Sequence, residues 1–137
     1  MKAKNKLAIY ELLGRAAYHF DQRELDELAA CFTEDATMLV NIADGQVFGP
    51  FEGRDAIMGL ISAALDAQTD MRRHIISNFL FEKEGNKNAT CVSQIVLAAT
   101  ENGEIRLITS GIYRDMVVKE NGRWRISDRK LDLELAF

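Results

Sequence analysis

Cysteine, proline and histidine are all scarce in this sequence, which has two cysteines, one proline and two histidines among its 137 residues. Cys31 and Cys91 lie far apart and neither belongs to a CxxC motif, so we expect two buried free thiols. His19 and His74 are also far apart, and no carboxylate cluster joins either of them at the spacing of metal ligands. We therefore expect neither a metal site nor a disulfide scaffold.

Long apolar runs and an excess of basic residues are missing as well. The chain has no stretch near the roughly 20 consecutive apolar residues that span a bilayer, and charged residues interrupt the segment where a signal peptide would be hydrophobic. The net charge is -4 and the lysines and arginines are dispersed, so no basic stripe can neutralise a row of phosphates. We expect a cytoplasmic protein that binds neither membranes nor nucleic acid.

The residues that are present suit one compact domain. The chain is 47% hydrophobic and 28% charged, and no repeat, linker or charge block divides it. A chain of this length can bury most of its apolar surface around a single core. We therefore predict one domain over residues 1–137.

The first half of the chain has helical periodicity. Apolar residues recur every three or four positions over residues 4–20, and again over 57–69. Between them, Asp21 and Glu24 have the spacing of a capping box ahead of a short second helix. The strand-forming segment 36–42 and the short return "QVFG", residues 46–49, predict a small hairpin, and Pro50 is expected to break the chain before the third helix.

From Met71 to the end, four long strand-like runs are separated by Gly and Asn turn clusters, which predicts an antiparallel meander. Strands of this length must twist and bend to keep packing against other elements. Together the two halves predict an α+β fold, a cone-shaped α+β barrel in which three N-terminal helices pack on a long, curved, mostly antiparallel sheet. Such a cone has an open mouth and a pocket.

His74 lies in one of these runs, "MRRHIISNFLFE", residues 71–82. Strict alternation places His74 and Asn78 on one face of the strand, and Ile75, Phe79 and Phe81 on the other. Both faces are partly apolar, so we expect a pocket or helix layer on one side and the partner subunit of a homodimer, or a higher homo-oligomer, on the other.

An imidazole in a pocket can exchange protons near neutral pH if a carboxylate fixes its tautomer and stabilises its charged form. Asp21 is the leading candidate for that carboxylate. It follows Gly14 and Ala17 on one helical stripe, where small residues would leave space, and it lies near Tyr18. A plain N-cap role would also explain Asp21, and a hydrogen-bonded core position would also explain His74.

Several segments together resemble a known family. In order along the chain they are "FDQRELDELAACFTEDATM", "GPFEGRDAI", the strand with H-x-x-x-N, and "YRDMVVKENGRWRISDRKL". The pattern is similar to the SnoaL-like branch of the nuclear transport factor 2-like superfamily, with its scytalone dehydratase, dehydrochlorinase and polyketide cyclase relatives. The resemblance covers nearly the whole chain and implies a small α+β cone with a ligand cavity.

The resemblance also implies a site. An aspartate and a histidine form a dyad in the dehydratase and dehydrochlorinase relatives, and the matching positions are Asp21 and His74. Asn78 would be a polar pocket group, and Tyr18 and Tyr113 would be hydroxyl donors. The following strand, "ATCVSQIVLAAT", lacks the second histidine of scytalone dehydratase, which argues against that particular substrate.

Other polar and aromatic residues have structural interpretations. Phe20 and Phe48 could line a cavity or belong to the plain core. His19 fits a solvated or interface position, Trp124 a core position, and Arg114 and Arg129 fit structural ion pairs.

The chemistry that remains is cofactor-free proton transfer. We predict a lyase or isomerase, such as a dehydratase or cyclase, that binds a small apolar or aromatic molecule, with His74 as general base and Asp21 orienting it. The alternative is a non-catalytic ligand-binding or assembly module, related to the small subunit of ring-hydroxylating dioxygenases. A cavity that His74 and Asp21 share would favour the enzyme, and a cavity filled by large side chains would favour the module.

Overall fold

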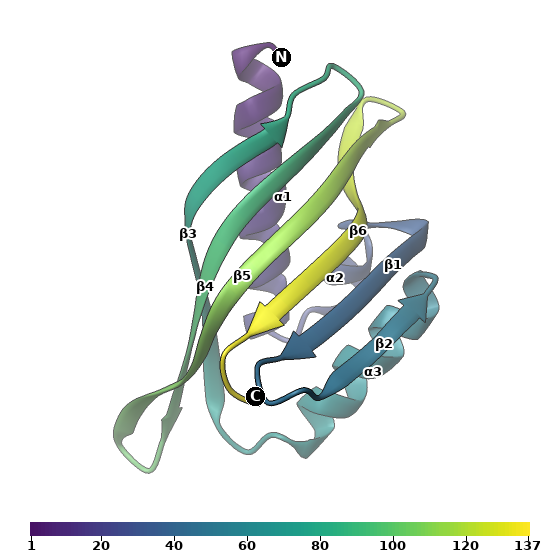
Figure 1. Ribbon diagram of the computed structural model, residues 1–137. Coiled ribbons are helices and arrows are strands. Elements are labelled where there is room, and N and C mark those ends of the chain that lie inside the picture. The colour runs from purple at the N-terminus through teal and green to yellow at the C-terminus, as the bar shows by residue number, and fades with distance from the viewer.

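A computed structural model describes all 137 residues (Figure 1). It contains three helices and six strands in the order α1 (Ala3–Asp21), α2 (Leu25–Ala29), β1 (Phe32–Ile42), β2 (Val47–Glu52), α3 (Arg54–Ala67), β3 (Met71–Lys83), β4 (Asn88–Glu101), β5 (Glu104–Glu120) and β6 (Arg123–Leu133).

The strands form one curved sheet in the order β2-β1-β6-β5-β4-β3. All neighbouring strands are antiparallel except β1 and β6, which run parallel. The predicted α+β class, with three helices on a long and mostly antiparallel sheet, is confirmed. The sheet does not close into a barrel, because β2 and β3 remain as its two edges.

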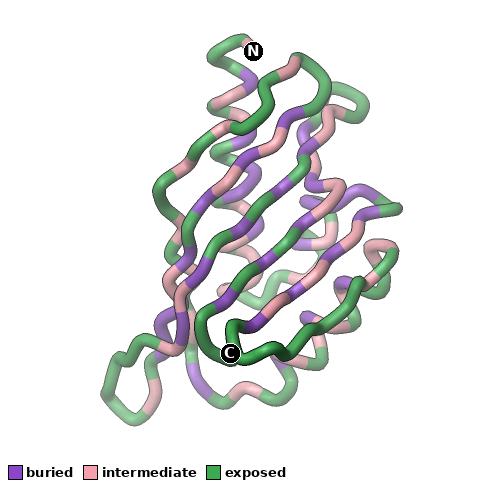
Figure 2. The backbone as a smooth tube through the Cα atoms, viewed as in Figure 1, coloured by how far each residue is buried: buried purple, intermediate pink, exposed green.

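All three helices cover the same face of the sheet (Figure 1). Their apolar stripes pack on the inward positions of the strands, as the helical periodicity requires. From α1 the buried residues include Ile9, Leu13 and Ala16, and from α3 they include Ile57 and Ile61. Along the central strands, buried and exposed positions alternate (Figure 2), so the core lies between the helices and one face of the sheet.

Two local predictions in the first half need correction. The predicted capping box does not form: α2 starts after Glu24, and no side chain caps it. The return strand does not stop before Pro50 but runs through it to Glu52, because β2 is an edge strand and can spare a backbone donor.

Strand β3 contains a β-bulge that changes which side chains face the helices. The pairing with β4 shifts between Ser77 and Leu80, and Asn78 has a left-handed backbone with φ 54°. Beyond the bulge the alternation is therefore inverted. Phe79 and Phe81 pack against Tyr10 of α1, with ring centroids 5.0 and 5.6 Å away.

The prediction that Phe79 and Phe81 lie on the outer face is wrong because of this extra residue. Leu80 takes the exposed position instead, while Ile75, which precedes the bulge, is exposed as predicted. Several other predictions are confirmed: Cys31 and Cys91 are buried free thiols, and Trp124 is buried. None of the three helices combines the length and the apolar character that crossing a membrane requires.

Candidate functional site

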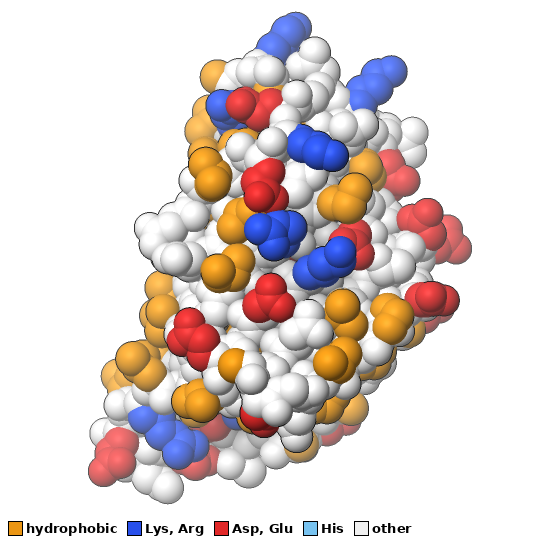
Figure 3. Space-filling model, viewed as in Figure 1, with side chains coloured by type: hydrophobic (Ala, Val, Ile, Leu, Met, Phe, Trp, Pro, Cys, Tyr) orange, Lys and Arg blue, Asp and Glu red, His pale blue; other side chains and the backbone are white.

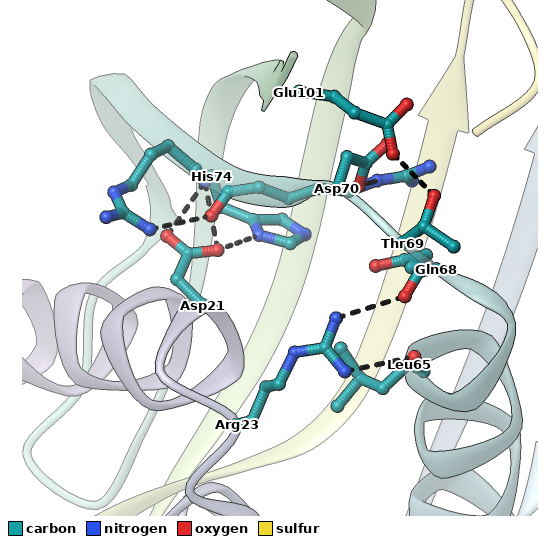
Figure 4. Close-up of polar contacts among 10 residues, drawn as sticks. Asp21, Arg23, Leu65, Gln68, Thr69, Asp70, His74 and Glu101 are labelled. Atoms are coloured by element: carbon teal, nitrogen blue, oxygen red, sulfur yellow. Dashed lines mark hydrogen bonds and ion pairs between the residues drawn. The ribbon is translucent and has the colours of Figure 1, made fainter. Parts of the chain in front are cut away.

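Asp21 and His74 meet where the end of α1 reaches β3 (Figure 4). Asp21 is the last residue of α1, and His74 is the fourth residue of β3. The imidazole Nδ1 lies 2.6 Å from Asp21 Oδ1, and the backbone N–H of His74 donates to the same carboxylate at 3.0 Å from Oδ2. The predicted pairing of these two residues is therefore present.

The Asp21 carboxylate does not cap a helix. Both of its oxygens face His74, one toward the ring and the backbone N–H and the other toward the backbone N–H alone. The interpretation of Asp21 as an N-cap is therefore wrong. Its place at the C-terminal end of α1, rather than at the start of α2, explains why the carboxylate is free to reach the sheet.

The environment of the pair fixes the orientation of the ring. The side chains of His74 and Asp21 are only 9% and 8% exposed, and the ring of Phe20 packs on His74 with centroids 4.4 Å apart. In the neutral ring, a carboxylate this close accepts the Nδ1 proton, which leaves the lone pair on the other ring nitrogen, Nε2. Nε2 has no protein partner and is available to a ligand.

His74 also lines an apolar cavity of about 60 Å³. Twelve of its 16 lining residues are hydrophobic, and they come from both the helices and the sheet. The apolar wall includes Phe20, Met38, Val40, Leu60, Ile61, Ala64, Ile95, Leu97, Tyr113, Leu131, Leu133 and Phe137; the polar wall consists of Gln68, Arg72, His74 and Thr109. The cavity thus joins a proton-accepting nitrogen to a largely apolar space.

The structure places two of the five predicted substrate-binding residues on this wall and three outside it. Phe20 and Tyr113 line the cavity. Tyr18 is 60% exposed on the surface of α1, so its predicted place in the pocket is wrong. Phe48 lies on the edge strand β2 and contacts Phe137 instead of the cavity, and Asn78 is exposed at the bulge.

Asn78 misses the pocket because the bulge turns it outward. Its side-chain amide donates to Gln94 on the neighbouring strand β4. Strict alternation from His74 predicted the opposite face, so the prediction of Asn78 as a pocket group is wrong for the same reason as that of Phe79.

Tyr113 lines the cavity and packs against a buried ion pair. Arg129 donates to both oxygens of Asp115 at 2.7 and 3.1 Å, and its guanidinium lies 4.1 Å from the centroid of the Tyr113 ring. Burial raises the pKa of Tyr113 above its ordinary value, although the charge of Arg129 opposes this shift. Tyr113 therefore stays a hydrogen-bond donor at neutral pH.

Burial by itself would lower the pKa of Arg129, but the nearby Asp115 carboxylate raises it above its ordinary value. The predicted ion-pair roles of Arg129 and Arg114 are confirmed, since Arg114 pairs with Glu82 at 2.8 Å. His19 pairs with Glu24 at 3.2 Å, outside the cavity. No three His, Cys, Asp or Glu side chains gather as a potential metal-binding set.

The cavity wall also holds an arginine, paired with a carboxylate outside the lining, that the sequence pattern had not been used to predict. Arg72 Nε donates to Asp70 Oδ1 at 2.9 Å, and Arg72 lines the cavity beside His74. Residues two positions apart on a strand share a face, so the alternation that selected His74 also points to Arg72. Gln68 precedes the strand and offered no such signal.

Arg23 ties the turn after α1 to the end of α3 (Figure 4). Its guanidinium donates to the backbone oxygens of Leu65 at 3.1 Å and Gln68 at 3.4 Å. A cation at the C-terminal end of a helix also complements the helix dipole. Arg23 thereby fixes the loop that follows Asp21 against the helix that forms one wall of the cavity.

These features define a class of protein: a small α+β domain with a helix-covered cavity and a carboxylate-bound histidine in its wall. Residues 1–130 match the SnoaL-like domain, and the chain belongs to this family, as the sequence pattern predicted. A search of curated proteins finds no match.

Solved structures with the same fold include relatives of modest identity. Rv3472(D26N), a protein of unknown function from Mycobacterium tuberculosis, is 27% identical with a TM-score of 0.80, over 96% of this chain and 73% of that one. A scytalone dehydratase-like protein from Novosphingobium aromaticivorans is 26% identical with a TM-score of 0.78, over 96% and 85%. A β subunit assigned to an aromatic-ring-hydroxylating dioxygenase from the same organism shares the fold, at 18% identity and a TM-score of 0.81, over 95% and 89%.

Proposed function

We propose that this protein is a cofactor-free acid–base enzyme, a lyase or isomerase that acts on a small apolar or aromatic compound. The observation that carries the proposal is the 2.6 Å contact between Asp21 and His74 at the wall of an apolar cavity. The likeness to a scytalone dehydratase-like protein gives independent support for elimination chemistry.

In the proposed mechanism, His74 Nε2 removes a proton from a substrate carbon. The electron pair of the broken C–H bond forms a double bond, while negative charge moves to a substrate oxygen or to a leaving group. Asp21 keeps the ring oriented and stabilises the imidazolium cation, which then returns its proton to the leaving group or to another carbon. Tyr113, another residue of the cavity lining, would donate a hydrogen bond from its hydroxyl to the charged oxygen.

A ring-opening probe can test this proposal without knowledge of the natural substrate. In 5-nitrobenzisoxazole, a base removes the ring C–H proton as the N–O bond breaks, and the product is a coloured cyanonitrophenolate. We expect wild-type protein to accelerate this reaction, and His74→Ala to lower the rate about 10²- to 10⁴-fold, the usual contribution of a general base.

The other histidine supplies the matched control. His19 lies outside the cavity and pairs with Glu24, so His19→Ala should leave the rate unchanged. Circular dichroism should show that both variants remain folded. A folded His74→Ala protein that opens the ring as fast as wild type would exclude the mechanism.

The alternative is a non-catalytic binding or assembly module. The similarity to a dioxygenase β subunit supports it, but that similarity is one of fold alone. A module would not need a proton acceptor directed at an apolar cavity. His74 lines the cavity while Asp21 holds its ring from outside the lining, and this arrangement favours the enzyme.

A further inference from the structure

Arg72 places a cation in the wall of a largely apolar cavity. Its side chain is only 15% exposed, and that of its partner Asp70 is 7% exposed. Only Arg72 Nε bonds to Asp70, and neither terminal nitrogen, Nη1 or Nη2, has a protein partner. An arginine held in this way keeps its outer edge free for another acceptor.

The buried arginine of the central strands behaves differently. Arg129 uses both Nε and Nη2 to hold Asp115, which satisfies the pair internally. A two-point contact of that kind is the usual arrangement for a structural arginine and carboxylate. The one-point contact of Arg72 leaves hydrogen-bonding capacity at the cavity that the protein itself does not use.

The position of Arg72 relative to His74 suits proton abstraction next to an oxygen. The two residues are two positions apart on the same face of β3, which separates their Cα atoms by roughly 7 Å. Both line the cavity, and so does Gln68, whose side chain also has no protein partner. A planar ligand can therefore place one atom at His74 and an oxygen at Arg72.

We propose that Arg72 is a catalytic residue that binds the substrate oxygen on which negative charge develops, so that the substrates are enolisable carbonyl compounds with an apolar body. This inference rests on the proposed function of His74 and names the chemical class on which it acts. His74 takes the proton from the carbon next to the carbonyl, the C–H electrons form a C=C bond, and the carbonyl electrons move to the oxygen. The resulting enolate accepts hydrogen bonds from the Nη groups, and the proton returns from His74.

The charges of the site are consistent with this step. In the proposed step His74 starts as the neutral imidazole beside Asp21, and the pair of Arg72 with Asp70 carries no net charge. Proton transfer creates one cation beside Asp21 and one anion beside Arg72, so each new charge forms next to an opposite one. Asp70 acts as a positioning residue, because its contact to Nε directs the outer edge of the guanidinium.

Phenolates are stable mimics of an enolate, because they carry the charged oxygen on a flat apolar ring. We would measure binding of 4-nitrophenol at a pH that ionises it in free solution, and compare it with the uncharged 4-nitroanisole. The variants are Arg72→Met, which keeps an unbranched apolar stem and removes the guanidinium, and a double variant, Asp70→Asn with Arg72→Met, which leaves no buried charge unpaired. We expect both to lose about tenfold or more in affinity for the phenolate and little for the anisole.

The adjacent arginine provides the control. Arg73 is exposed on the opposite face and does not line the cavity, so Arg73→Met should bind both probes as wild type does. Unchanged phenolate affinity in a folded Arg72→Met or double variant would overturn the inference. Equal affinity of the wild-type protein for anisole and phenolate would overturn it as well.

The binding measurement separates this inference from the proposed function. Because the probe is already ionised, no proton acceptor is needed, and His74→Asn should still prefer the phenolate. If His74→Ala did not slow the benzisoxazole reaction, the proposed function would be wrong, but the preference for the phenolate would remain. If Arg72→Met did not weaken phenolate binding, this inference would be wrong, but the benzisoxazole reaction would still depend on His74.

Discussion

At the scale of single residues, Asp21 has two tasks that use the same carboxylate. It fixes the His74 ring through Nδ1, and it also accepts the backbone N–H of the same residue. The second bond holds the end of α1 against β3, so the carboxylate proposed for catalysis also stabilises the fold. Substitutions at Asp21 should therefore change both the reaction and the stability.

The two tasks can be separated by comparing Asp21→Asn with Asp21→Ala. Asparagine keeps one acceptor oxygen but removes the charge that stabilises the imidazolium. We expect Asp21→Asn to lower the rate of benzisoxazole opening, by less than the roughly 10²- to 10⁴-fold loss expected for His74→Ala. Asp21→Ala should in addition lower the free energy of unfolding by about 1–3 kcal/mol, because it leaves buried donors unsatisfied.

Urea denaturation followed by circular dichroism would measure the stability, with Glu24→Gln as a control at an exposed carboxylate nearby. An Asp21→Asn protein with full activity would show that the carboxylate charge does not contribute to the reaction.

At the scale of elements, the bulge at Asn78 decides which side of β3 covers the core. Its left-handed backbone suits Asn or Gly and is unfavourable for a β-branched residue. We expect Asn78→Val to lower the free energy of unfolding by about 1–3 kcal/mol, whereas Asn78→Gly should change it by less than about 1 kcal/mol. Chemical denaturation of the two variants would measure this difference.

Ser77→Val is the matched control for this prediction. Ser77 is the exposed neighbour of Asn78, and its backbone is not left-handed, so the same valine should be tolerated there. If Asn78→Val were as stable as wild type, the bulge would not depend on the residue at this position.

Up to this bulge, the sequence was sufficient to predict the strand. Period-two alternation correctly put His74 inward and Ile75 outward, and turn clusters correctly separated the four long strands. Period-two alternation gave the wrong face for Phe79 and Phe81, because the one extra residue of the bulge inverts the pattern beyond it. Local sequence patterns also could not predict the parallel pairing of β1 with β6, since it joins segments far apart in the chain.

The candidate site was predictable to a similar degree. The family resemblance and one helical stripe identified Asp21 and His74, and the fold brought them together. The residues that line the cavity could not be predicted in this way, because the lining depends on contacts between elements far apart in sequence. Tyr18 and Phe48 were included as aromatic residues near the expected site, yet neither reaches the cavity, whereas Arg72 does.

At the scale of the whole molecule, the site lies where three elements meet. Asp21 joins α1 to β3, and Arg23 joins the following turn to α3. All of these contacts are on the helix side of the sheet. The opposite face is open, and Figure 3 shows hydrophobic side chains interspersed with acidic and basic ones across it.

We propose that a second copy of the chain covers this outer face and makes a homodimer. Exposed apolar side chains, including Ile75, Ile112 and Met116, lie on the strands there. Arg114 is opposite Lys130 on neighbouring strands, and acidic residues flank Lys130 along β6. A surface that carries both signs of charge around apolar residues can be complementary to itself about a two-fold axis.

Light scattering coupled to size-exclusion chromatography would test the dimer. We expect the mass of two chains for the wild-type protein, and a shift toward one chain for Ile112→Glu, because burying the new carboxylate in the interface is unfavourable. Leu7 is also exposed, but it lies on α1, on the other side of the sheet, so Leu7→Glu should remain dimeric. A wild-type protein with the mass of one chain at all concentrations tested would contradict the proposal, and the outer face would then be solvent-exposed in the functional protein.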